Sequence, residues 1–402
     1  MFQTFIPRER ASGKSFNALV RNGAATALLL LAAGCGGSAS GPLPEKSNDR
    51  DPGQHPNVAL DTFIQAELTR QNIPGLALIV QQNDKVVYAK GYGYANLEKA
   101  LGATTEQRFQ IGSISKQFLA AATMLLVEEG KVALDDKIGK YLGTVPAEWN
   151  NITIRHLLSH TSGLQRDSDE ALSNQADTHG SYTSDQLLAI ATKYKPLTDP
   201  GLSYAYSNLG YQLMGLVVEK ASGAFYGELI QNRIFTPLGM TSARIIDAGK
   251  PEGTAMGYVL RDKRPVAFDM TALTAGARSY VRLAAGGIEM SATDLAKWDA
   301  SLSTEKILKK SSIDQLWKAN TLVQKADTYT INYGLGFFLS DYNNHPKVYH
   351  SGSMYAFTTD YLRYTNDKLS VIVLTNLGTD ADPEFISRTV ANMTTPGILP
   401  PK

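Results

Sequence analysis

Residues 109–130 read FQIGSISKQFLAAATMLLVEEG, an apolar entry segment that runs directly into a long helical pattern. Strong helix formers fill the stretch, and Gly130 is a typical C-terminal stop, so we predict a helix that begins near Ser113. Residues three apart share one helix face, which places the Lys116 amine one turn above the Ser113 hydroxyl. A desolvated amine can polarise a serine or take its proton, so Ser113 is a candidate nucleophile.

The same Ser-x-x-Lys spacing occurs again from Ser303 to Lys306, inside the charged stretch SLSTEKILKKSS. Charge runs usually lie on a solvated surface, so we interpret this copy as an exposed helix end. An ordinary N-cap serine followed by a surface lysine is the alternative for Ser113 as well. The motifs that accompany the first copy decide between these interpretations.

A second motif is Tyr206-Ser207-Asn208, which follows a Pro-Gly turn and precedes a helical pattern that ends near Gly223. Tyr206 is therefore predicted at a loop-to-helix junction. A phenol can relay a proton, and the Asn208 amide can bond a lysine amine and a substrate carbonyl. The Tyr-x-Asn pattern also occurs in strand or turn settings, where we interpret it as structural, at Tyr94, Tyr342 and Tyr364.

A third motif is His350-Ser351-Gly352, at the end of a strand pattern that starts near Val348. Gly352 would let a substrate backbone approach closely. A hairpin is predicted to follow it, around residues 365–367.

Ser-x-x-Lys, Tyr-x-Asn and His-x-Gly, in this order, resemble the motifs of the serine β-lactamase and penicillin-binding superfamily. The chain is most similar to the branch of class C β-lactamases, D-alanyl-D-alanine carboxypeptidases, D-aminopeptidases and β-lactamase-like carboxylesterases. The likeness runs from about Ala59 to Asn376. It includes the segments NIPGLALIVQQNDKVVYAKGYGYAN, ITIRHLLSHTSGL, LAAGGIEMSATDLAKWDASL and YGLGFFL.

The resemblance implies a role for each matched residue. Ser113 would be acylated with help from Lys116, and Tyr206 would act as general base and acid. Asn208 would orient Lys116, while His350 would hold Tyr206 and the polar end of the substrate. The oxyanion hole would consist of the backbone N–H groups of Ser113 and Ser353, beside the substrate-binding Gly352.

The chain departs from the family pattern at three positions around the third motif. His350 stands where lysine is common, and we expect it to titrate near the usual histidine pKa of about 6.5, shifted by burial and by Lys116. Tyr349 and Ala356 stand where glycine is common, and their bulk would crowd the substrate pocket. We therefore rank peptidase or esterase activity above efficient β-lactamase activity.

Other features do not change this prediction. His156 and His160 have the i, i+4 spacing of a paired zinc site, but no glutamate lies between them and no cysteine is near, so no metal and no cofactor are expected. The formal net charge of +1 provides no basic footprint for nucleic acid. The expected partners are a small-molecule or peptide substrate and, through a lipid anchor, a membrane, with the protein as a monomer.

The N-terminal sequence predicts where the protein is located. A basic region and an apolar run of about ten residues predict a lipoprotein signal peptide over residues 1–34, because the run is too short to span a membrane. Cys35, the single cysteine, would be lipidated after LAAG, although an ordinary secreted protein is the alternative. Residues 35–57 are predicted to form a flexible tether. The protein is thus expected in the bacterial cell envelope, facing the periplasm or exterior.

The domain itself is predicted over residues 58–396 as an α/β fold of the β-lactamase/transpeptidase type. Strand signals at both chain ends predict an antiparallel sheet with flanking helices, formed by residues 58–115 and 333–396. Helix signals between them predict an inserted, mostly helical lobe over 116–332. Two functions remain open: an acyl-enzyme serine hydrolase acting on an amide, ester or β-lactam carbonyl, or a lipid-anchored penicillin-binding or peptidoglycan-sensing protein with little turnover.

Overall fold

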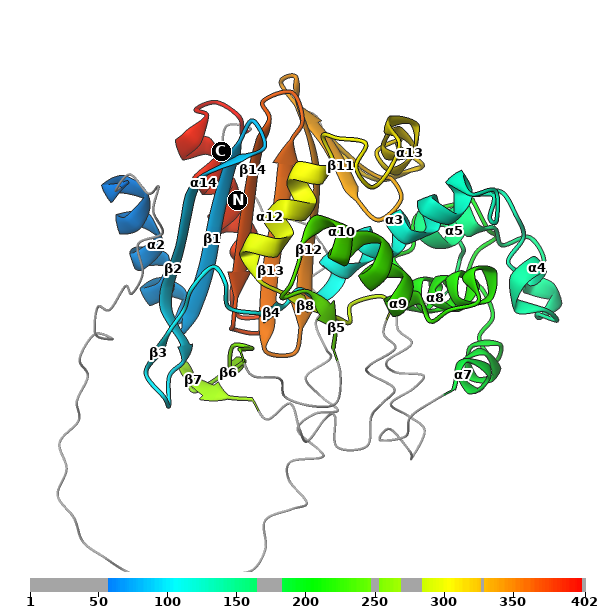
Figure 1. Cartoon of the computed structure of the whole chain (residues 1–402), viewed down its shortest axis with the longest axis horizontal. Coiled ribbons are helices and arrows are strands. Elements are labelled where there is room, and N and C mark those ends of the chain that lie inside the picture. The colour runs from blue at the N-terminus through cyan, green and yellow to red at the C-terminus, as the bar shows by residue number, and fades with distance from the viewer. Residues whose placement is uncertain (1–56, 165–182, 247–252, 269–283, 327–328, 400–402) are drawn as a thin grey trace, which may run out of the picture. The chain divides into compact units, whose positions relative to one another are not determined.

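An antiparallel sheet of nine strands organises the part of the chain that the structure, a computed structural model, describes: residues 57–164, 183–246, 253–268, 284–326 and 329–399 (Figure 1). The strand order is β3-β2-β1-β14-β13-β12-β11-β10-β9. The strands are β1 (Gly75–Gln82), β2 (Lys85–Asn96), β3 (Leu101–Gly102), β9 (Thr321–Lys325), β10 (Thr330–Tyr333), β11 (Phe338–Tyr342), β12 (His345–Met354), β13 (Phe357–Tyr364) and β14 (Leu369–Thr375). The predicted fold class is confirmed.

Both ends of the chain build the centre of this sheet, as the sequence predicts. β1 pairs with β14 in the register Leu76↔Thr375, so the first and last long strands are neighbours. Tight turns set the hairpins: Asn83 and Asn343 begin two-residue turns, each in the left-handed region with φ near +50°, which suits the twist of antiparallel strands. The predicted hairpin after β13 is confirmed by the pairing Tyr364↔Leu369.

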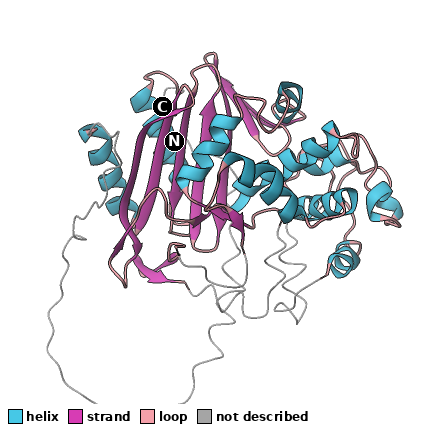
Figure 2. Cartoon of the chain, viewed as in Figure 1, coloured by secondary structure: helices cyan, strands magenta, loops and turns pink. Residues whose placement is uncertain are grey.

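Helices cover both faces of the sheet and form a further group beside it (Figure 2). Asp299 of α12 (Ala292–Ser301) accepts hydrogen bonds from Tyr361 and Ser370. Ser387 of α14 (Pro383–Thr394) donates a hydrogen bond to Asp360. Neighbouring residues of a strand point to opposite faces, so these two helices lie on opposite faces of β13. The helices are α2 (Val58–Gln71), α3 (Ser115–Glu128), α4 (Gly139–Leu142), α5 (Ile154–Leu158), α7 (Ser184–Ala191), α8 (Asn208–Ser222), α9 (Tyr226–Ile230), α10 (Thr236–Leu238), α12 (Ala292–Ser301), α13 (Lys310–Leu316) and α14 (Pro383–Thr394).

The range 116–332, predicted as a mostly helical insertion, also contributes strands. β9 and β10 extend the large sheet at one edge. Four further strands of this range lie in two small sheets: β8 (Ile288–Met290) pairs with β5 (Arg244–Ile245) and with β4 (Phe109–Gln110), which precedes the range, and β6 (Tyr258–Arg261) pairs with β7 (Arg264–Ala267). Helix α12 packs on β1 and β14, so it belongs with the sheet. None of the described helices is long and apolar enough to cross a membrane.

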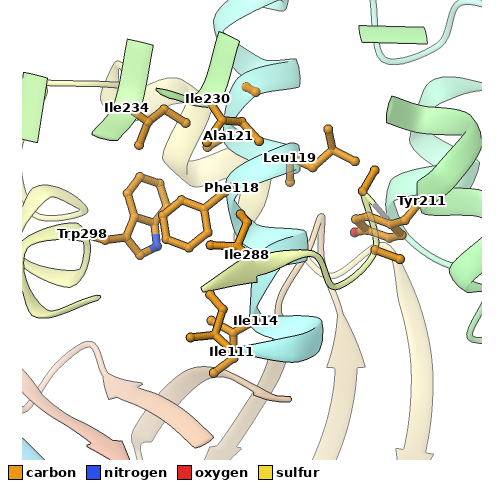
Figure 3. Close-up of a cluster of buried hydrophobic side chains, with 14 of the residues drawn as sticks. Ile111, Ile114, Phe118, Leu119, Ala121, Tyr211, Ile230, Ile234, Ile288 and Trp298 are labelled. Atoms are coloured by element: carbon orange, nitrogen blue, oxygen red, sulfur yellow. The ribbon is translucent and has the colours of Figure 1, made fainter. Parts of the chain in front are cut away.

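Helix α3 is the centre of the hydrophobic core (Figure 3). Its residues from Ser115 to Leu126 are all buried, and its apolar side chains point in every direction, as expected of a helix enclosed by protein. Phe118 contacts the rings of Trp298 at 4.9 Å and Phe235 at 5.3 Å between centroids. Fully burying such a side chain contributes roughly 1.5–3 kcal/mol, so the helix that carries the Ser-x-x-Lys motif is held rigidly.

Candidate active site

Ser113 lies in a short 3₁₀ turn, Gly112–Ile114, immediately before α3. The α-helix therefore starts at Ser115, two residues later than the sequence predicts, because a tighter turn precedes its first full turn, as is common at helix N-termini. Gly112 has φ +53°, a conformation that favours glycine. Ser113 remains half-buried while its neighbours on both sides are buried.

The Ser113 hydroxyl meets the two other groups that the motifs single out. Lys116 Nζ lies 3.0 Å from Ser113 Oγ, and the Tyr206 hydroxyl lies 2.8 Å from the same oxygen. Tyr206 comes from the loop just before α8, whose N-cap is Ser207. The loop-to-helix setting predicted for Tyr206 is therefore present. A serine oxygen within hydrogen-bond distance of an amine and a phenol has two routes for its proton.

The Lys116 side chain is fully buried, and hydrogen-bond acceptors lie around its ammonium group. Besides Ser113 Oγ, its ammonium group contacts Asn208 Oδ1 at 2.9 Å and the Ala285 carbonyl at 2.7 Å. The rings of Tyr206 and Tyr211 lie 4.8 and 5.3 Å away and supply cation–π contacts. Ala285 could not be identified from the sequence, because a backbone carbonyl leaves no signal in the residue type.

These acceptors determine how the Lys116 amine is oriented when it loses a proton. Carbonyl oxygens only accept, so Asn208 Oδ1 and the Ala285 carbonyl each require an N–H from Lys116. A neutral amine has two N–H groups and one lone pair. If the two N–H groups of neutral Lys116 keep their hydrogen bonds to these carbonyls, its lone pair points at Ser113 Oγ. In this arrangement the amine can accept a proton from the serine.

The third motif lies against the Ser113 turn. A β-carbon placed on Gly112 would come within 2.6 Å of the Ser353 backbone nitrogen, so β12 and the turn are in close contact. A β-carbon on Gly352 would lie 1.9 Å from the Ile111 carbonyl oxygen. The chain's own backbone thus makes a close approach at Gly352, and the approach of a substrate to this glycine stays a prediction.

Replacing Gly352 with alanine is expected to destabilise the fold by about 3 kcal/mol or more, because the added methyl group would meet backbone and the Thr359 hydroxyl. Gly102→Ala is the matched control, since the nearest atom to its β-carbon would be 4.0 Å away, on an exposed edge strand. Urea unfolding of both variants measures the difference. Equal stability of the two would contradict the close contact between β12 and Ile111.

His350 is buried, and both of its ring nitrogens have partners. Nδ1 lies 2.6 Å from the Ser351 carbonyl, which can only accept, so Nδ1 carries the proton. Nε2 then accepts from the Tyr333 hydroxyl at 3.1 Å. The Tyr206 ring is 6.3 Å from His350 between centroids, so Tyr333 is the direct hydrogen-bond partner of the imidazole. Tyr333, the first residue of YGLGFFL, has no role that the sequence alone predicts.

Burial, and after it the positive charge of Lys116, lowers the pKa of His350 to about 3. The expected titration near 6.5 is therefore wrong: the imidazole stays neutral through the physiological range. The sequence could show that a histidine stands in the third motif. It could not show that the side chain would be enclosed on all sides, which is what penalises the charged form.

The lowered pKa of His350 predicts an acid destabilisation. In the unfolded chain the imidazole binds a proton below about pH 6.5, whereas in the folded protein it does so only near pH 3, so stability falls as the pH drops between these values. By pH 4.5 the loss from this one group is roughly 2–3 kcal/mol. Urea unfolding at pH 7 and 4.5 should show a smaller pH dependence in His350→Gln than in the unchanged protein. The same dependence in both would contradict the buried, neutral imidazole.

The bulk of Tyr349 does not crowd the substrate pocket. Alternate residues of β12 point to opposite faces, so Tyr349 points away from the face that carries His350. Its ring is buried, stacked on Phe338 at 5.4 Å, with Lys347 Nζ 4.1 Å from its centroid. Ala356 is also buried and packs on Gly257. The expected crowding at these two positions is therefore wrong, because both side chains pack inside the fold.

The two histidines of HLLSH have separate partners. His156 accepts from the Thr153 backbone N–H through Nδ1 and so caps α5. His160 is fully buried and accepts from the Ser207 backbone N–H. Among the described residues, no group of three or more His, Cys, Asp or Glu side chains is arranged to hold a metal ion. The predicted lipidation site Cys35, like the signal peptide and nearly all of the tether, lies outside the described residues.

Comparison with known proteins bears on the fold and the family. "Protein flp" of Staphylococcus aureus (strain MRSA252) is 27% identical over 334 residues, which are 81% of this chain and 64% of that protein. "Penicillin-binding protein 4*" of Bacillus subtilis (strain 168) is 27% identical over 345 residues, or 82% of this chain and 74% of that protein. The chain thus spans about two thirds of the length of the first of these relatives.

A solved structure also resembles this chain. The octameric penicillin-binding protein homologue from Pyrococcus abyssi superimposes with a TM-score of 0.75 at 29% sequence identity, covering 84% of this chain and 76% of that one. That this homologue is octameric weakens the expectation of a monomer. The profile of the family described as Beta-lactamase matches residues 60–392, which is most of the chain. The chain belongs to the β-lactamase family.

Proposed function

We propose that this protein is a serine hydrolase that forms an acyl-enzyme on Ser113. The observation that supports the proposal is the convergence of Lys116 Nζ and the Tyr206 hydroxyl on Ser113 Oγ, at 3.0 and 2.8 Å. Both distances are within the range for proton transfer along a hydrogen bond. The substrate class is an amide, ester or β-lactam, because each offers a carbonyl carbon that the serine oxygen can attack.

The reaction begins with attack of Ser113 Oγ on the carbonyl carbon. The hydroxyl proton passes to the Lys116–Tyr206 pair, whose members titrate as one coupled system. The oxyanion is stabilised by the backbone N–H groups of Ser113 and Ser353. Tyr206 returns a proton to the leaving amine or alcohol as the carbonyl re-forms and the bond to the leaving group breaks. Water then attacks the Ser113 ester, releases the acid and restores the serine.

The charge of the third motif lets us rank the three possible substrate classes. A buried, neutral His350 offers a substrate carboxylate less attraction than a lysine would, and this favours peptidase or esterase activity over efficient β-lactamase activity. Hydrolysis of a short-chain p-nitrophenyl ester, a D-alanyl-D-alanine peptide and a chromogenic cephalosporin tests the ranking. The ester or the peptide is expected to have the highest kcat/KM. Cephalosporin turnover far above both would overturn it.

A protein that is acylated and then stalls is the second candidate, since the same residues support acylation whether or not water reaches the ester. The time course of product release separates the two functions. Sustained turnover supports the hydrolase. One equivalent of product followed by a flat trace would instead identify a penicillin-binding or peptidoglycan-sensing protein.

The cell envelope remains the proposed location. The basic and apolar N-terminal segments and Cys35 after LAAG are the features that support a lipid anchor. Detergent partitioning of the expressed full chain tests it, with Cys35→Ser as the comparison. The unchanged chain is expected in the detergent phase and the variant in the aqueous phase.

A further inference from the structure

His160 has an unusual backbone conformation for a large side chain. It follows α5 and has φ +58°, in the left-handed region that few residues other than glycine adopt, although asparagine, aspartate and histidine are enriched there. The side chain is nevertheless fully buried. Strain of this kind costs of order 1–3 kcal/mol and persists where the surrounding structure requires it. The partners of His160 show what requires it.

Two hydrogen bonds join His160 to the residues on either side of Tyr206. The His160 carbonyl accepts from the Ala205 backbone N–H at 2.8 Å. Its Nδ1 accepts from the Ser207 backbone N–H at 3.0 Å. Tyr206 is the residue between these two attachment points. One residue of the HLLSH segment therefore fixes the backbone on both sides of the phenol.

The imidazole also packs on the Tyr206 ring. The two centroids are 4.1 Å apart with planes inclined by 33°, the shortest ring contact that either residue makes among the described residues. Tyr211 and Tyr333 enclose the imidazole at 5.0 and 4.7 Å. The ring of Tyr206 is thus supported on one face while its hydroxyl reaches Ser113 Oγ.

This arrangement works only for a neutral imidazole. An imidazolium has two N–H donors and no acceptor, so it could not accept from Ser207. Burial, followed by the positive charge of Lys116, holds the pKa of His160 well below its usual value. The neutral tautomer carries its proton on Nε2, which has no hydrogen-bond partner among the residues that the structure describes.

We infer that His160 is a positioning residue for Tyr206, holding the phenol hydroxyl against Ser113 by a hydrogen bond to Ser207 and by ring packing. The inference rests on the proposed role of Tyr206 in proton transfer. Displacing a reacting group by about 1 Å can lower a rate about 100-fold, so small losses of support should be measurable. His160 itself contacts neither Ser113 nor Lys116 through a hydrogen bond among those described.

Two variants separate the hydrogen bond from the ring. His160→Asn keeps an acceptor two bonds from the β-carbon and tolerates φ above zero, but removes the ring. His160→Phe keeps a ring and removes the acceptor. The rate constant for acylation by a fluorophosphonate probe is expected to fall about 10-fold in the first and more in the second, with little change in probe affinity.

His156→Asn is the matched control, because His156 belongs to the same segment and caps α5 without touching Tyr206. It is expected to change the melting temperature but not the acylation rate. Thermal melts of all variants identify any that fail to fold. Because His160→Asn suits the local backbone, it provides the decisive measurement.

A double-mutant cycle with Tyr206→Phe tests whether His160 acts through the phenol. The effect of His160→Asn is expected to disappear in the Tyr206→Phe background. The same loss in both backgrounds, or no loss in either, would overturn the positioning role while leaving the proposed hydrolase intact. A Tyr206→Phe variant that is acylated at the unchanged rate would instead remove Tyr206 from the proton path, and the basis of this inference with it.

Discussion

Ser113→Ala is expected to abolish covalent labelling by a fluorescent penicillin or a fluorophosphonate and to lower turnover by roughly 10³-fold or more. The reason is that the substitution removes the one oxygen on which Lys116 and Tyr206 converge. The fold should survive, because a half-buried hydroxyl at a helix start contributes little to stability. Labelling on a denaturing gel, together with intact-protein mass spectrometry, measures the loss.

The second Ser-x-x-Lys copy provides the control for this variant. Ser303 and Lys306 are exposed, and Ser303 Oγ donates to Asp84 at 2.9 Å and not to a lysine or tyrosine among the described residues. Ser303→Ala should therefore be labelled at the unchanged rate. Equal labelling of Ser113→Ala and the unchanged protein would show that another group is acylated.

Lys116→Met is expected to lower the acylation rate by about 10³-fold or more, because methionine fills a similar volume but has no amine to take the serine proton. Stability should fall as well. Asn208 Oδ1, which is half-buried, and the buried Ala285 carbonyl would each lose a partner, and the unpaired buried acceptor alone costs about 1–3 kcal/mol. Lys306→Met, at an exposed position of the same spacing, should change neither property.

An arginine at position 116 separates charge from proton transfer. The guanidinium does not lose its proton in proteins, so Lys116→Arg keeps the positive charge but cannot act as a base. Activity as low as in Lys116→Met would support a lysine that takes the proton. A rate near that of the unchanged protein in Lys116→Arg would contradict this and assign the base role to Tyr206, with Lys116 acting through its charge.

The sequence by itself determined the elements that depend on local spacing. The i, i+3 relation of Ser113 and Lys116 follows from helix geometry alone, and a helix of strong formers with one charged side chain in its interior marks a special position. The turn residues 365–367, between two strand patterns, predict a hairpin because residues of these types favour tight turns. Each motif spans only a few residues, so it can be recognised in the sequence. The order of the three motifs along the chain then indicates the family and with it the fold class.

The tertiary structure alone decided what depends on segments far apart in the chain. Lys116 needs the Ala285 carbonyl 169 residues away, and no residue type announces a backbone acceptor. The pKa of His350 depends on enclosure by other elements, which desolvates the imidazole. Tyr349 is buried because Phe338 of the neighbouring strand β11 stacks on its ring at 5.4 Å. The support of Tyr206 by His160 joins two loops by packing and backbone hydrogen bonds, interactions that form only when the folded chain brings them together.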